Sequence, residues 1–208
     1  MIRAKHLVLV MSLIFTTNIM YGQFQFGPKI GVGGSTQSEL ANFYDNEDIH
    51  VSYEVGLTVR NEFNDLFALK GDLLYSQKGR TVNIIEEDIN YDQTDEFNYL
   101  IIPVKAEFSI PVKTSKVFLA TGPYAGILLD ASSEIAYTSS EIDNGSTDIK
   151  DQARNMDYGL SMELGVIIPV SINDLQISLN YDMGLTEVYE YDNVANNKSF
   201  TINLAYLF

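Results

Sequence analysis

The last eleven residues, Lys198–Phe208, read KSFTINLAYLF. In an extended strand successive side chains point to opposite faces, so one face of this segment carries Phe200, Ile202, Leu204, Tyr206 and Phe208. The other face is mostly polar. A closed membrane barrel needs a last strand that pairs with the first and turns an apolar face to lipid. This segment therefore predicts a transmembrane β-barrel, and the rest of the chain can be compared with that prediction.

Six earlier segments show the same period of two, which favours strands over helices. In a seventh, 116–129, the facing is ambiguous because Gly122, Pro123 and Gly126 dilute the alternation. With the last one, the predicted strands are 24–33, 49–60, 67–78, 98–109, 116–129, 156–168, 175–185 and 198–208. Pro103 lies inside the fourth and cannot donate to a ladder, which predicts a local irregularity there. The polar segments 35–48, 79–97, 130–155 and 186–197 are predicted loops. We therefore expect an all-β fold: an eight-stranded antiparallel up-and-down transmembrane β-barrel with four long extracellular loops.

The face opposite the apolar one is charged, which distinguishes a membrane barrel from a soluble barrel with an apolar cavity. We expect five cations and six anions to point into the lumen: Lys29, Arg60, Lys70, Lys78, Lys105, Glu54, Asp72, Glu107, Asp157, Glu163 and Asp182. Buried charges are tolerated when they are paired, and eight strands enclose an interior that side chains can fill. The sequence predicts a lumen plugged by a charge network.

The first 22 residues differ from the rest. Arg3 and Lys5 precede an apolar run from Leu7 to Phe15, which is typical of a secretory signal peptide and shorter than a membrane-spanning helix. The alternative is an uncleaved N-terminal anchor helix. We expect a signal peptide at 1–22, one barrel domain at 23–208, and an outer-membrane location after export and cleavage.

Composition narrows the functional classes. The formal net charge is -15, which argues against nucleic-acid binding, and the absence of cysteine excludes disulfides and thiolate metal sites. We expect no cofactor, contact with outer-membrane lipid, and a monomeric barrel, because a closed barrel has no free edge. A protein of the envelope or secretion machinery is the expected kind of partner.

Several short motifs are similar to those of one known family. They are LLYSQKG at 73–79, YLIIP at 99–103, TGPY at 121–124, DYG at 157–159 and YDMGL at 181–185. Together they resemble the small outer-membrane β-barrel proteins called porin-like or PorT-like. That family often has glutamates where Asp72 and Ile101 stand here. The resemblance implies a barrel in the outer membrane, while the functions of its members are diverse.

Three groups of residues could carry chemistry. His50 has Ser52 and Glu54 on the same strand face, but successive residues on one face are about 7 Å apart, so a solvated rim histidine is preferred to a catalytic one. The predicted loops hold nineteen of the 28 acidic residues, and Asp143, Asn144 and Asp148 form the best candidate for Ca²⁺, although without EF-hand spacing. The alternative is a solvated loop. The strand tyrosines fit an aromatic girdle better than a ligand-stacking set.

These observations predict a non-enzymatic outer-membrane barrel with a structural, adhesion-like or secretion-accessory role through its acidic loops. The alternative is a narrow passive porin-like channel for small solutes.

Overall fold

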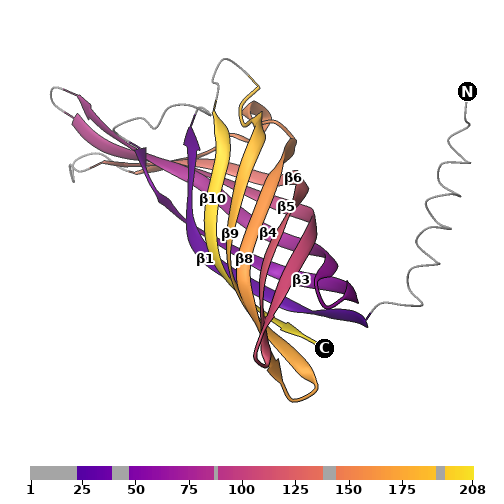
Figure 1. The fold of residues 1–208 in the computed structure, drawn as a ribbon. Coiled ribbons are helices and arrows are strands. Elements are labelled where there is room, and N and C mark those ends of the chain that lie inside the picture. Colours follow the sequence, from indigo (N-terminus) through magenta and orange to yellow (C-terminus); the bar gives the residue numbers. More distant parts are fainter. Residues whose placement is uncertain (1–22, 39–46, 87–88, 138–143, 191–194) are drawn as a thin grey trace, which may run out of the picture.

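Antiparallel strands form a closed ring in the computed structural model of the chain (Figure 1). The structure describes residues 23–38, 47–86, 89–137, 144–190 and 195–208. The predicted signal peptide lies outside these residues. Among the described residues, no helix is long and apolar enough to cross a bilayer.

Eight long strands make the ring, and each is followed along the chain by its neighbour in space. They are β1 (Gln23–Ser38), β3 (His50–Asn64), β4 (Phe67–Glu86), β5 (Ile89–Val112), β6 (Ser115–Tyr137), β8 (Met156–Val170), β9 (Asn173–Glu187) and β10 (Asn196–Leu207). β1 pairs with β10 in antiparallel register, for example Ile30 with Leu204. This pairing closes the barrel, so the predicted fold class is confirmed.

The strands are joined by tight turns at one end of the barrel, which we call the turn end. Lys113 and Ser171 adopt positive φ angles of 57° and 63° in two of these turns. In the third, the side-chain oxygen of Asn64 accepts hydrogen bonds from the backbone N–H groups of Leu66 and Phe67, both at 2.9 Å. Gln23 and Phe208 lie at the same end. We call the opposite end the loop end.

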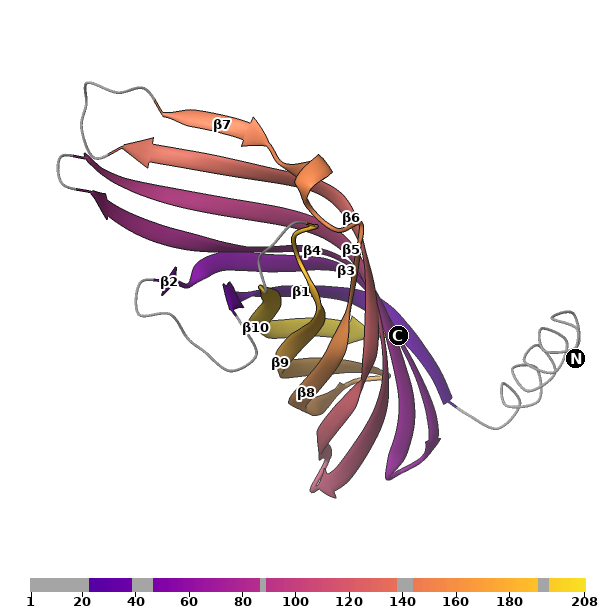
Figure 2. The ribbon, with the colours of Figure 1, turned by 90° about the horizontal axis from the view of Figure 1, so that it is seen from above.

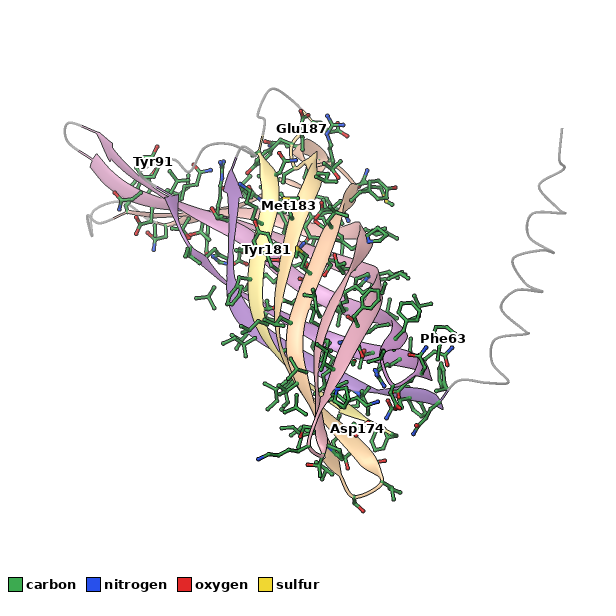
Figure 3. The ribbon with its side chains drawn as sticks, in the orientation of Figure 1. Phe63, Tyr91, Asp174, Tyr181, Met183 and Glu187 are labelled. Carbon is green, nitrogen blue, oxygen red and sulfur yellow. The ribbon has the colours of Figure 1, made fainter. Side chains whose placement is uncertain are left out.

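The apolar residues of the strands point away from the ring. Val51, Leu57 and Ile202 are 68%, 57% and 53% exposed, whereas their polar neighbours along each strand are buried inside. Aromatic rings mark both ends of this apolar belt, including Phe63 at the turn end and Tyr181 nearer the loop end (Figure 3). Such a belt with two aromatic girdles is typical of a barrel embedded in a membrane.

The predicted loop at 79–97 is wrong. β4 and β5 continue as paired strands to Glu86 and from Ile89, and β6 runs to Tyr137 instead of ending at Leu129. These extensions project past the rest of the barrel as a sheet (Figure 2), with the short strands β2 (Glu47–Asp48) and β7 (Gly145–Asp148) on its edges. The outer face of this projecting sheet is as acidic as a loop, although the side chains still alternate between its two faces. The number of long loops is therefore not confirmed, because most of segment 79–97 is paired strand.

Around Pro103 the irregularity is small. The ladder between β4 and β5 pairs Gly71 with Val104 and resumes at Leu74 with Ile101, in the same register. The register shift lies instead between Asn98 and Tyr99, on the ladder with β6. Proline therefore interrupts the pairing locally without displacing the strand.

Candidate functional site

Charged side chains meet across the middle of the barrel. Strands β1, β3, β4 and β5 follow one another around the ring. β1, β4 and β5 each place one lysine at an inward position in this middle part. Glu163 comes from β8 on the other side of the ring. The members of this middle layer are Lys29, Lys70, Lys105, Glu54, Asp72 and Glu163, all at most 4% exposed.

Glu163 connects the three lysines of the middle layer. Its carboxylate lies 2.6 Å from Lys70 Nζ and 3.8 Å from Lys29 Nζ, and it also accepts a hydrogen bond from Lys105. Asp72 contacts Lys29 at 3.1 Å and Lys105 at 3.2 Å. Each ammonium therefore has a carboxylate within contact distance, which offsets the cost of removing these charges from water.

A second layer lies nearer the turn end. Arg60 Nε donates to Glu107 at 2.8 Å, and Arg60 Nη1 donates to Glu62 at 2.6 Å. Lys116 Nζ donates to the other oxygen of Glu62, also at 2.6 Å. Glu62 and Lys116 are not among the predicted lumen residues, because both stand at strand ends where alternation gives a weak signal.

A third layer lies toward the loop end. Lys78 Nζ is 3.6 Å from Asp157 and 3.8 Å from Asp182, and it sits 4.6 Å from the centre of the Tyr124 ring. Asp157 also accepts a hydrogen bond from the Tyr124 hydroxyl at 3.2 Å. Lys198 is also buried, at 7% exposed, but the ladders place it opposite Thr36 on β1 and Met183 on β9, not among the inward residues of this layer.

An apolar cluster lies between the third layer and the loop end. The barrel wall and two connecting segments contribute Phe97, Tyr99, Ile101, Tyr124, Leu128, Ala131, Ile149, Ala153 and Val188. Ile149 N–H donates to the backbone carbonyl of Ala131 in the wall at 3.0 Å, and Arg154 N–H donates to that of Val188 at 2.8 Å, which joins the two connecting segments. We call these segments, 149–153 and 188–189, the cap.

Beside the cap is a pocket of about 250 Å³ that opens at the loop end. The projecting sheet contributes Arg80, Gln93, Asp95 and Ser133, and the cap contributes Ile149, Gln152 and Tyr189. Asp95 accepts hydrogen bonds from Ser133 Oγ at 2.7 Å and Tyr189 Oη at 2.8 Å. Its carboxylate is also 3.1 Å from Arg80 Nε.

The environment of Asp95 favours its charged form. Burial alone would raise the pKa of this carboxyl group, but the hydrogen bonds from Ser133, Gln93 and Tyr189 and the charge of Arg80 together lower it. Burial and the negative charge of Asp95 raise the pKa of the Tyr189 hydroxyl, although Arg80 opposes this rise. At neutral pH the pocket thus holds an ionised Asp95 balanced by Arg80, with Tyr189 as a neutral donor.

The structure does not assemble the other candidate sites. Asp143 lies outside the described residues, and Asn144 and Asp148 are exposed and accept backbone N–H bonds from Tyr137 and Lys150. No group of three or more potential metal ligands occurs among the described side chains. His50 Nε2 lies 3.4 Å from Glu96, while Glu54 belongs to the middle layer with Lys29, so the two do not share one site.

Three solved structures are similar to this chain at low sequence identity. Ail of Yersinia pestis, solved with the heparin analogue sucrose octasulfate, is 16% identical, with 89% of this chain and 99% of Ail covered and a TM-score of 0.46. OprG of Pseudomonas aeruginosa is 12% identical, with 90% and 96% covered and a TM-score of 0.47. Neisserial surface protein A is 11% identical, with 88% and 95% covered and a TM-score of 0.45.

Sequence comparison gives the family. No curated protein matches the chain significantly. The model of the outer membrane protein beta-barrel domain matches residues 15–190, which is most of the chain. The closed antiparallel ring and its apolar belt agree with this match. The chain therefore belongs to the outer membrane protein beta-barrel domain family.

Proposed function

We propose that this chain is a non-enzymatic outer-membrane barrel whose lumen is plugged by side chains and whose recognition surface is the loop end. Within its family we assign it to the PorT-like branch, with a structural, adhesion-like or secretion-accessory role. The observation that carries the proposal is the middle layer, where Glu163 bridges Lys29, Lys70 and Lys105 across the ring. The apolar cluster under the cap adds a second obstruction.

The proposed partners follow from the surfaces. The apolar belt binds outer-membrane lipid, and β1–β10 pairing leaves the ring without an open edge, which favours a monomer. The projecting sheet is the surface most accessible to an envelope or secretion-machinery protein (Figure 2). We also propose that residues 1–22 are removed as a signal peptide.

The second candidate function is a narrow passive channel for small solutes. Ser52 Oγ, Lys78 Nζ and Asn203 Oδ1 are buried without a hydrogen-bond partner among the described residues. Buried polar groups of this kind are commonly satisfied by internal water. If such waters formed a continuous row through the lumen, small solutes could pass along it.

Planar-bilayer recordings distinguish the two functions. We expect the purified protein to give no steady single-channel steps, because bridged charges fill the middle of the lumen and the apolar cluster covers the third layer. An open porin reconstituted in the same way is the positive control. Reproducible steps of one size from this protein would contradict the plugged lumen and support the channel.

Labelling of single cysteines tests the orientation. Because the chain has no cysteine, Ser146→Cys at the loop end and Thr114→Cys at the turn end each introduce the sole thiol, at an exposed position. We expect a membrane-impermeant maleimide to label the Ser146→Cys variant on intact cells, and the Thr114→Cys variant only after the envelope is broken. The opposite pattern would place the loop end in the periplasm and remove it as a surface for external recognition.

A further inference from the structure

The inner face of the projecting sheet is a continuous surface that leads away from the pocket. Directly opposed residues of antiparallel strands share a face. The first row is Arg80, Asp95 and Ser133, the second is Val82, Gln93 and Ile135, and the third contains Tyr91 and Tyr137. Same-face residues lie about 7 Å apart along a strand, so the first and third rows are about 14 Å apart.

The two faces of this sheet differ in chemistry. The outer face carries Thr81, Thr94 and Glu134 in one row and Asn83, Asp92 and Ala136 in the next. The inner face carries the aromatic pair Tyr91 and Tyr137, whose ring centres are 5.6 Å apart (Tyr91 is labelled in Figure 3). Both rings are half-buried, and they provide an aromatic platform at the far end of the inner face.

The pocket at the near end is polar but electrically balanced. Arg80 and Asp95 neutralise each other at 3.1 Å, while Gln93, Ser133 and Gln152 add neutral donors and acceptors. Tyr189 and Ile149 supply the apolar part of the wall. At about 250 Å³ the pocket is smaller than the roughly 300–1,000 Å³ that encloses a drug-sized ligand, so it takes one small ring.

Charge and polarity narrow the ligand class. The formal charge of -15 and the acids of the outer face disfavour a polyanion. Gln93 Nε2 already donates to Asp95 and Ser133, but a purely apolar chain would cover the remaining polar groups of Gln93 and Gln152 without forming any hydrogen bond with them. A ring with hydroxyl groups at its edge can form hydrogen bonds in the polar pocket, and its apolar face can stack on the tyrosines.

We propose that this inner face binds a neutral oligosaccharide, with one sugar ring in the pocket and later rings over Tyr91 and Tyr137. The inference deepens the proposed function, since it depends on recognition at the loop end. It does not depend on a plugged lumen.

Isothermal titration of the full chain tests the proposal, in a detergent whose headgroup is not a sugar. The neutral probes are maltohexaose, cellohexaose and chitohexaose, with a heparin-derived hexasaccharide as the anionic probe. We expect at least one neutral probe to bind with a Kd on the order of 0.1–1 mM. The double variant Tyr91→Ala/Tyr137→Ala and the single variant Gln152→Ala should each weaken that binding at least about tenfold.

Two matched variants separate binding from folding. Tyr91→Phe keeps the stacking ring, and Glu134→Ala changes the outer face of the same sheet, so both should bind as the unaltered protein does. The proposal is overturned if no neutral probe binds, if only the anionic probe binds, or if binding survives the loss of both tyrosines. Binding of an extended peptide in place of the sugars would overturn it too, while leaving the proposed recognition at the loop end intact.

Discussion

Replacing Glu163 with glutamine is expected to lower the free energy of unfolding of the barrel by about 3–5 kcal/mol. Glutamine has nearly the same shape, so the variant removes charge and leaves the packing unchanged. Lys70, Lys105 and Lys29 would then share the remaining carboxylates of the middle layer, with Ser178 Oγ losing the charged acceptor that it binds at 2.7 Å. An unbalanced ammonium in a buried site is the source of the loss.

Urea titration of the protein folded into lipid vesicles measures this effect by linear extrapolation. Glu187→Gln is the control, because its ion pair with Arg154 at 3.0 Å is exposed and should contribute less than about 1 kcal/mol. Adding Lys105→Met to Glu163→Gln restores the balance of charges and should recover part of the loss, which a double-mutant cycle quantifies. Equal losses for Glu163→Gln and Glu187→Gln would show that the middle layer does not stabilise the barrel.

The period-two alternation was sufficient to predict the ring and its sidedness. It assigns Val51, Leu57 and Ile202 to the lipid face because a strand cannot sort its side chains in any other way. Alternation could not predict which carboxylate meets which lysine. Lys70 and Glu163 are 93 positions apart in the sequence, and their contact depends on the stagger of strands around the closed ring.

Composition misled the prediction at the loop end. Arg80, Asp95 and Glu96 are polar residues of the kind found in loops, yet they stand on paired strands. A sheet that projects into water can carry polar residues on both faces near the rim, so polarity did not distinguish strand from loop there. The cap was also missed. Ile149 and Val188 are single apolar residues within polar segments, and only the folded arrangement brings them onto Phe97 and Leu128.

Gly56→Ala is expected to destabilise the barrel by at least about 3 kcal/mol, at the upper end of the cost of overpacking. A Cβ at Gly56 would lie 2.0 Å from the carbonyl oxygen of Leu73 and 2.9 Å from Cα of Leu74, both in the backbone of β4. No side-chain rotation relieves a contact with backbone, so β3 and β4 would have to separate where the ring is tightly curved.

Gly71→Ala is the matched control, because its Cβ would lie 3.5 Å from Val59 Cγ2, an ordinary contact. Both glycines are half-buried strand residues on the same ladder, and alanine is otherwise the better residue in a strand interior. Urea titration in vesicles should therefore show Gly71→Ala to be neutral or slightly stabilising while Gly56→Ala is severely destabilised. If the two variants unfold at the same urea concentration, the barrel does not need the close approach of β3 to β4 at Gly56 in order to close.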